Sequence, residues 1–197
     1  MTPQEDRVLY LFQHTGAYLQ GHFRLTSGLH SPGYLQSALV LRYPKHAERL
    51  GELLAEKLMA LGGGQPFDLV IAPALGGLII GHEVARALGL PFLFTERDAD
   101  RKMSLRRGFT LEPGARAAIV EDVITTGGST KEVVDIVRSL GAVPVAAGSI
   151  IDRSGGSADV GIRRAALETL AVPAWDPAVC PLCAQGEPVV KPGSRPV

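Results

Sequence analysis

The chain has 197 residues, of which 46% are hydrophobic and 20% charged, a composition that favours a folded globular protein and excludes a mainly disordered one. Its 20 basic and 20 acidic residues give a net charge of zero, which excludes the overall positive field of a duplex DNA-binding protein. The longest uncharged apolar run, Leu69–Gly81, is too short to cross a bilayer, and the polar N-terminus does not resemble a secretory signal. We therefore expect a cytoplasmic protein that binds neither nucleic acid nor a membrane.

The first third of the chain mixes helical and turn-forming segments. Apolar residues within 4–19 predict a short helix, and the turn-rich segment 21–34 predicts a loop or a short hairpin. Segment 37–42 is a candidate strand. Pro44 begins a predicted helix whose leucines recur every three or four residues until the three glycines at 62–64 end it.

From residue 68 onward, apolar strands alternate with amphipathic helices. The pattern predicts strands at 68–72, 91–95, 117–120 and 143–151, with one helix between Gly76 and Gly89 and another that ends at Gly141. This alternation predicts an α/β fold with a mostly parallel sheet that helices cover on both faces. Because ligands of such sheets bind beyond the carboxyl ends of the strands, each strand-to-helix junction is a candidate site.

The tail from Pro173 is rich in proline. We expect neither regular helix nor central strand there, and a path over the surface. Cys180 and Cys183 have the spacing of half a zinc site, but the sequence has no second cysteine pair and its five histidines are scattered. We interpret the cysteines as a free or packed pair; a zinc site shared between two subunits is the alternative.

The strongest local signal is the segment AAIVEDVITTGGST at 117–130. A buried strand leads into two adjacent acids, Glu121 and Asp122, and then into a turn of hydroxyl residues and glycines that opens a helix. Gly127 and Gly128 allow backbone N–H groups to approach an anion, and the helix N-terminus adds positive potential, so the turn suits a phosphate. The two carboxylates suit the hydroxyls of a sugar attached to that phosphate, or a metal ion.

The same segment has a simpler interpretation as a strand, a turn and a well-capped helix with solvated acids. Ser129 and Glu132 have the spacing of a capping box, which would begin the helix at Ser129. The ordered combination of strand, acid pair, hydroxyl–glycine turn and helix favours a binding site instead. The segment matches neither the Walker A loop nor the dinucleotide-binding fingerprint.

The segment VEDVITTGGST resembles the phosphoribosyl-pyrophosphate (PRPP) binding motif of the type I phosphoribosyltransferases. Nearly the whole chain is similar to the orotate phosphoribosyltransferases within that family, through FRLTSGLHSPGY, TERDADRKMSLRRGF, IDRSGG and CPLCAQGEPVVKPGSR. The resemblance implies the type I phosphoribosyltransferase fold in one domain, with hood elements at 1–43, a core at 44–172 and an extended tail at 173–197. It also implies an enzyme of pyrimidine (UMP) biosynthesis that converts orotate and PRPP to orotidine 5′-phosphate and pyrophosphate.

The resemblance assigns PRPP to three parts of the chain. In the family, the acid pair binds the ribose hydroxyls, the hydroxyl–glycine turn binds the 5′-phosphate, and the turn at 72–77 binds pyrophosphate through backbone N–H groups. Many members carry a lysine where Gly76 stands. The implied PRPP-binding residues are Ala74, Gly76, Gly77, Arg97, Arg106, Glu121, Asp122, Val123, Ile124, Thr125, Thr126, Gly127, Gly128 and Ser129.

The base is assigned to residues from both ends of the chain. Thr125 and Arg153 are implied to lie near orotate, whose carboxylate suits the planar two-point fork of an arginine. A surface arginine in a Ser/Gly turn is the alternative for Arg153. Ser27, Ser31 and Tyr34 are implied to line the base pocket, with Tyr34 available for stacking.

Segment 96–107 carries five cations among three acids. The resemblance implies a mobile lid that closes over pyrophosphate, stabilises its growing negative charge and keeps water out; a solvated charged loop is the alternative. Lys102 is the implied catalytic lid residue, with Arg97 and Arg106 as further candidates and Asp122 as the catalytic acid of the ribose site. The commoner family members carry a lid histidine that is absent here, and a lysine at the position of Thr26.

The reaction implied by the resemblance is displacement at the anomeric carbon of PRPP through an oxocarbenium-like transition state. Mg²⁺ is expected as the cofactor, bound through PRPP and not by direct protein ligands. The family also implies a homodimer whose lid reaches the neighbouring subunit.

Two other functions stay open on the sequence. The first is transfer of phosphoribose to another base, such as adenine, xanthine or uracil, which would keep 121–129 and differ around Arg153 and 23–34. The second is a non-catalytic nucleotide-sensing or RNA-binding regulator on the same fold, against which the retained lid cations argue.

Overall fold

The computed structural model describes residues 8–25, 27–63 and 67–192. The chain divides into two compact units, one formed by 41–170 and the other by 1–40 together with 171–197. The expected hood and tail therefore belong largely to the same unit. Thr26, where the resemblance places a lysine in other enzymes, lies outside the described residues.

The larger unit is built on a six-stranded sheet in the order β5-β4-β3-β6-β7-β8. Every pairing is parallel except β4 with β5, so the predicted mostly parallel sheet is confirmed. The strands are β3 (Leu69–Pro73), β4 (Phe92–Arg97), β5 (Met103–Leu105), β6 (Arg116–Ile124), β7 (Val143–Asp152) and β8 (Arg163–Thr169).

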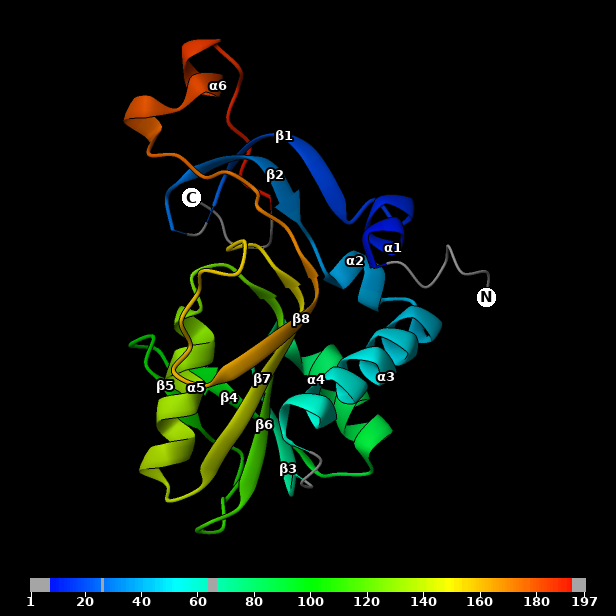
Figure 1. The fold of residues 1–197 in the computed structure, drawn as a ribbon. Helices are drawn as coiled ribbons and strands as arrows, with labels where there is room; N and C mark the ends of the chain where they lie inside the picture. The colour runs from blue at the N-terminus through cyan, green and yellow to red at the C-terminus, as the bar shows by residue number, and fades with distance from the viewer. Residues whose placement is uncertain (1–7, 26, 64–66, 193–197) are drawn as a thin grey trace. The chain divides into compact units, whose positions relative to one another are not determined.

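Helices cover both faces of this sheet, as the alternating pattern predicts. Figure 1 shows α5 (Gly128–Ser139) on one face, and α3 (Pro44–Leu61) with α4 (Gly77–Leu88) on the other. On the α5 side, Val133, Val134 and Val137 pack against buried residues of β3 and β6. The central strands β3 and β6 and the second half of β7 are buried, which is why they are apolar runs in the sequence.

Three local predictions differ from the structure. Segment 37–42 contains the short helix α2 (Ala38–Leu41), because a short apolar run alone does not distinguish a strand from a helix. The strand predicted at 117–120 extends through both acids to Ile124. The sequence pattern misses β5 and the edge strand β8, whose residues are only partly buried and therefore lack a continuous apolar run.

The smaller unit contains α1 (Val8–His14) and an antiparallel hairpin of β1 (Tyr18–Arg24) and β2 (His30–Leu35), which confirms the hairpin among the two possibilities at 21–34. The tail pairs with this hairpin through backbone hydrogen bonds between His30 and Trp175 and between Val190 and its partners His22 and Arg24. The prediction that the tail lacks helix is wrong for two short turns, η1 (Pro177–Val179) and α6 (Pro181–Ala184). Each begins with a proline, which the first helical position tolerates because its N–H needs no partner.

Cys180 and Cys183 are free thiols, in agreement with one part of the prediction, but the scattered spacing of the histidines does not reveal their neighbours. His22 and His30 of the hairpin lie beside Cys180 and Cys183 of the tail. None of the described helices is both long and apolar enough to span a bilayer.

Candidate active site

The predicted PRPP residues gather at the carboxyl edge of adjacent parallel strands. β6 lies between β3 and β7, so the segments that follow these three strands emerge side by side. Backbone hydrogen bonds tie the strand ends together: Arg153 N donates to Ile124 O at 2.7 Å, and Ala74 N donates to Thr95 O at 2.8 Å. The topology therefore brings 74–77, 121–129 and Arg153 to one edge of the sheet.

The turn after β6 has the features of a phosphate cradle. Gly127 is the N-cap of α5 with a φ of 82°, and a β-carbon there would lie 2.8 Å from Val160 Cγ1, so only glycine fits. Thr125, Thr126 and Ser129 are exposed around it. Because the first N–H groups of a helix have no partner within it, they and the three hydroxyls offer a set of donors to an anion.

The predicted capping box is wrong. α5 begins at Gly128 and no side chain caps it, which places Ser129 inside the first turn. Glu132 instead forms an ion pair with Arg97, with 2.9 Å between Glu132 Oε2 and Arg97 Nη2. The left-handed glycine, and not a serine side chain, makes the turn into this helix.

The two acids of the motif have different environments. Glu121 is buried, whereas Asp122 is half-buried. Asp122 N donates to Glu121 Oε1 at 3.2 Å, and Val123 N donates to Asp122 Oδ1 at 2.8 Å. Burial, and then the negative charge of Asp122, raises the pKa of Glu121 well above its ordinary value. Glu121 thus favours its protonated form, in which it can donate a hydrogen bond as well as accept one.

The predicted pyrophosphate loop joins β3 to α4 and meets Asp122. Gly76 is the N-cap of α4, and a β-carbon on it would lie 2.6 Å from Asp122 Oδ1. The Ala74–Leu75 peptide bond is cis. Because Ala74 N already donates to Thr95 O, its N–H is not available to a pyrophosphate in this conformation, unlike the expectation. Gly76 and Gly77 lie at the start of α4, where backbone N–H groups suit an anion.

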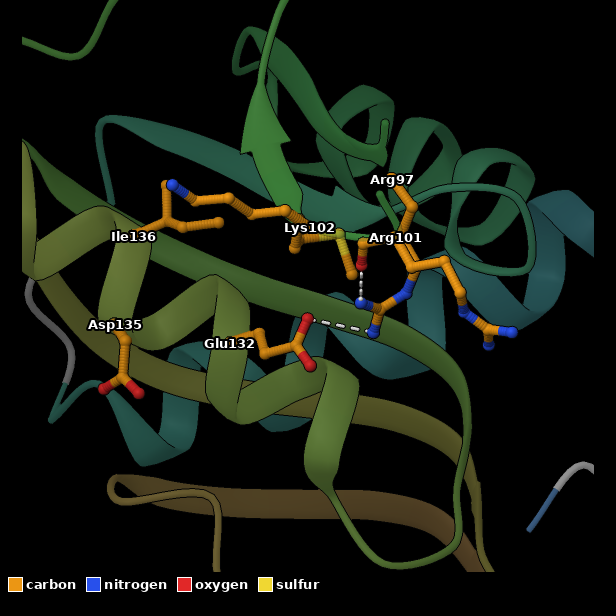
Figure 2. A pocket seen from close by; sticks show the side chains of 7 residues that line it. Arg97, Arg101, Lys102, Glu132, Asp135 and Ile136 are labelled. Carbon is orange, nitrogen blue, oxygen red and sulfur yellow. Dashed lines mark hydrogen bonds and ion pairs between the residues drawn. The ribbon is translucent and has the colours of Figure 1, made fainter. Parts of the chain in front are cut away.

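The predicted lid is a β-hairpin formed by β4 and β5. Arg97 ends β4, and its guanidinium donates to Arg101 O at 2.7 Å while it pairs with Glu132 (Figure 2). The hairpin and α5 line an open pocket of about 320 Å³, whose wall holds Lys102 and Arg101 together with the acids Glu132 and Asp135. This wall carries both basic and acidic side chains and contains none of residues 121–129. We therefore do not assign PRPP to this pocket.

The other lid cations are more exposed. Arg107 makes two hydrogen bonds to Glu96, at 2.6 and 2.7 Å, and these lower the pKa of the Glu96 carboxyl. These two hydrogen bonds link β4 to the segment that follows β5. Lys102 and Arg106 are exposed to solvent. The structure therefore places the implied catalytic lysine on the exposed side of the hairpin, and its role stays a prediction.

Arg153 directly follows β7 and is buried rather than on the surface. The neighbouring Asp152 accepts hydrogen bonds from Ser154 N, Ser154 Oγ and Arg164 Nη1, at 2.8, 2.6 and 2.5 Å. Burial raises the pKa of Asp152, but these hydrogen bonds outweigh it, so the net pKa is lowered. The ionised network fixes the turn that carries Arg153, which excludes the alternative of a loose surface arginine.

The remaining base-pocket candidates lie in the smaller unit. Ser31 is fully buried, and its single hydroxyl proton can be donated to Pro173 O at 2.8 Å or to Gly33 O at 3.0 Å, so it ties the hairpin to the tail. Ser27 is exposed, and its Oγ accepts a long hydrogen bond from Leu29 N at 3.5 Å. Tyr34 is half-buried with its ring 6.0 Å from that of Phe23. Ser31 thus has a structural role, whereas Ser27 and Tyr34 stay candidates.

Comparison with known proteins identifies the family. The model of the phosphoribosyl transferase domain matches residues 39–161. The chain is 52% identical over 190 residues to the orotate phosphoribosyltransferase of Pelotomaculum thermopropionicum, with 96% of this chain and 97% of that one covered. It is 50% identical, with the same coverage, to that of Desulforamulus reducens.

The chain belongs to the orotate phosphoribosyltransferase family.

A solved orotate phosphoribosyltransferase from Aeropyrum pernix has the same fold, with a TM-score of 0.64 and 25% identity over 81% of this chain and 92% of that one. This similarity and the matched domain confirm the type I phosphoribosyltransferase fold that the sequence predicts.

Two features of this orotate phosphoribosyltransferase family member were missed by sequence reasoning. The Asp152–Arg164 pair joins β7 to β8, and the second strand was not predicted. The contact between Gly76 and Asp122 joins segments that are distant along the chain. The Gly-Gly pair at 76–77 was the available signal, since adjacent glycines at a strand–helix junction often mark a close approach of another group.

Proposed function

We propose that this protein transfers the phosphoribosyl group of PRPP to orotate, giving orotidine 5′-phosphate and pyrophosphate, as a step of pyrimidine (UMP) biosynthesis in the cytoplasm. The observation that carries the proposal is the edge of the sheet where Asp122, the turn at 125–128 and the start of α4 meet. This edge combines a carboxylate for ribose with two helix N-termini for phosphates.

The proposed reaction is a displacement at the anomeric carbon. A ring nitrogen of orotate forms the new bond on the face opposite the pyrophosphate, releases its proton, and the C–O bond to pyrophosphate breaks with the electron pair leaving on oxygen. Asp122, and Glu121 through its hydrogen-bonding capacity, hold the ribose hydroxyls, while the exposed hydroxyls of 125–129 hold the 5′-phosphate. Positioning and charge stabilisation supply the rate, because no covalent intermediate with the protein is needed.

The leaving pyrophosphate gains negative charge as the bond breaks. Backbone N–H groups at Gly76 and Gly77 and the cations of the 96–107 hairpin are the groups that we assign to it. Arg97 is held by Glu132 and Arg101, so Lys102 and Arg106 are freer to approach an anion. We therefore keep Lys102 as the proposed catalytic cation.

We propose Mg²⁺ as the cofactor, bound through PRPP. The two acids fit this arrangement better than direct ligation, because Glu121 is buried and Asp122 Oδ1 already accepts from Val123 N. When bound, Mg²⁺ would neutralise charge on the pyrophosphate oxygens.

A PRPP-dependent assay with Mg²⁺ and a panel of bases tests the function. We expect orotate absorbance to fall as pyrophosphate is released, with no turnover of adenine, xanthine or uracil. Turnover of one of those bases and not of orotate would show that the substrate is that base, and the orotate assignment would be wrong. No turnover of any base, with PRPP binding retained, would favour the nucleotide-sensing regulator.

The role of Asp122 is tested separately by Asp122→Asn. We expect kcat/KM for PRPP to fall by about 10² to 10³-fold with little change in the melting temperature, because the charge of a half-buried carboxylate is lost at the ribose. Glu112→Gln is the matched control, since Glu112 is an exposed acid outside the site. Equal activity of both variants would remove Asp122 from the mechanism.

We also propose a homodimer in which the 96–107 hairpin of one subunit serves the other subunit's site. The exposed cations at this hairpin support the proposal. Mixing Lys102→Gln with Asp122→Asn protein tests it, because a mixed dimer with shared sites has one site without either substitution. Activity should return on mixing; if each hairpin serves its own subunit, both sites stay defective and no activity returns.

A further inference from the structure

Four side chains with metal-binding atoms converge in the smaller unit, outside the proposed active site. His22 belongs to β1 and His30 to β2, whereas Cys180 immediately precedes α6 and Cys183 lies within it. Figure 1 labels these three elements. Their ligand atoms all lie within 4.8 Å of one another. The two histidines and Cys180 are buried, whereas Cys183 is exposed. The cysteines are free thiols, so both sulfurs are available as ligands.

The distances within this cluster are close to those of a tetrahedral site. Cys180 Sγ lies 3.4 Å and Cys183 Sγ 3.7 Å from His22 Nε2, and Cys183 Sγ lies 3.3 Å from His30 Nδ1. Around a zinc ion with ordinary bond lengths, sulfur and nitrogen ligands stand about 3.6 Å apart. The two ring nitrogens are 2.9 Å apart and would have to separate by about 0.4 Å.

The surroundings of the cluster prepare His22 for metal binding. His22 Nδ1 lies 2.8 Å from the backbone carbonyl of Glu187, an acceptor that requires Nδ1 to carry the proton. The lone pair of His22 is then on Nε2, the atom that faces His30 and both cysteines. A backbone carbonyl behind a ligating histidine is the usual second partner at metal sites.

Backbone hydrogen bonds on both sides of the cysteines in the sequence attach the tail to the hairpin. His30 exchanges two hydrogen bonds with Trp175, each 2.8 Å long, and His22 O accepts from Val190 N at 2.8 Å. The cysteines lie between these two tail residues in the sequence. The ligands are therefore fixed by main-chain contacts that do not depend on the metal.

We propose that His22, His30, Cys180 and Cys183 bind one structural Zn²⁺. Two thiolates and two imidazoles in a compact, mostly buried tetrahedral set are the ligands that zinc prefers, and four protein ligands leave no open position for a catalytic water. The ion links the hairpin to a tail whose cysteines stand at least 150 positions after the two histidines in the chain. A unit with so small a core gains stability from such a link.

Metal analysis of the purified full-length protein is the first test. We expect roughly one zinc per chain after incubation with equimolar Zn²⁺ and gel filtration. Replacement by Co²⁺ should give the thiolate-to-cobalt absorption of a tetrahedral site. Chelation together with a thiol reagent should release the zinc and lower the melting temperature by at least about 5 °C.

Variants assign the ligands. Cys183→Ser and His22→Gln should each lower zinc affinity by at least about 10²-fold. His14→Gln is the matched control, because His14 is an exposed histidine of the same unit and lies outside the cluster. It should retain full zinc occupancy. If a ligand variant does not fold, the cobalt spectrum of the unmodified protein still decides the case.

Three results would overturn the proposal. One is wild-type protein that takes up neither Zn²⁺ nor Co²⁺ and melts at the same temperature with and without chelator, which would leave a hydrogen-bonded His–His–Cys cluster. Another is a Cys180–Cys183 disulfide in protein that does not bind zinc. The last is iron in place of zinc. These measurements do not depend on turnover, so their failure is distinguishable from a failure of the proposed enzyme activity.

Discussion

The main chain of Gly76 lies directly against the carboxylate of Asp122, so that a β-carbon on Gly76 would stand 2.6 Å from Asp122 Oδ1. The same oxygen accepts a hydrogen bond from Val123 N at 2.8 Å. A side chain at residue 76 would therefore displace the Asp122 carboxylate from the position that it has in this structure. In this protein, the glycine of the loop and the orientation of the carboxylate at the proposed ribose site depend on each other.

Gly76→Ala should reduce activity more than stability. The added methyl group would force the Asp122 carboxylate to move, and a displacement of about 1 Å at a positioning group costs about 10²-fold in rate. We expect kcat/KM for PRPP to fall by that order in steady-state assays, with the melting temperature nearly unchanged. A variant with normal kinetics would show that activity does not depend on the present position of the Asp122 carboxylate.

Gly81→Ala in the same helix is the contrasting control. A β-carbon there would overlap the half-buried ring of Phe92, away from the proposed site. Overpacking of this kind costs about 1–3 kcal/mol in the free energy of unfolding. We expect a lower melting temperature and normal kinetics per folded molecule, the reverse of Gly76→Ala.

Glu121 should make the ligand-free protein less stable as the pH rises. Its pKa is raised in the folded protein, mainly by burial and then by Asp122, above the ordinary value of 4.5. The folded state then holds a proton that the unfolded state releases, so the contribution of Glu121 is complete below about pH 4.5 and is lost as the pH rises through the folded pKa.

Glu121→Gln should remove this dependence. We expect the variant to be more stable than the wild type near neutral pH, with a higher melting temperature, because it loses no proton on folding or unfolding. Thermal unfolding of both proteins between about pH 5 and pH 8 measures the difference. A difference that stays constant over this range would contradict the raised pKa.

Lys102→Gln should lower kcat with little effect on the KM for PRPP. The charge acts on pyrophosphate chiefly as the bond breaks, and loss of one such group costs about 10² to 10³-fold. Lys45→Gln is the control, because Lys45 is an exposed lysine at the start of α3. Should Lys102→Gln match the control, Arg106 becomes the first candidate for the same role.

Arg153→Lys should weaken binding of orotidine 5′-phosphate while leaving uridine 5′-phosphate nearly unaffected. The two nucleotides differ by the carboxylate that we assign to the guanidinium, and a charged hydrogen bond is worth roughly 10- to 100-fold in affinity. Titration calorimetry with both nucleotides measures the difference. Arg163→Lys on β8, at an exposed position, is the control. Equal weakening of both nucleotides would indicate a general structural role for Arg153.

The sequence determined those parts of the fold and site that are contiguous. The helix from Pro44, the apolar strands and the strand–turn–helix of 117–139 follow from periodicity, because the hydrogen bonds and burial that form them lie within short segments. The phosphate cradle belongs to this class, since its hydroxyls, glycines and helix N-terminus come from one uninterrupted stretch.

Only the tertiary structure decided the relationships that join distant segments. Glu132 pairs with Arg97 instead of capping its own helix, Gly76 meets Asp122, and two histidines of the hairpin complete the half-site of Cys180 and Cys183. Each depends on which strands become neighbours and on how the tail pairs with β1 and β2. Those pairings are set by burial and backbone hydrogen bonding over the whole fold, and residue spacing along the chain does not encode them locally.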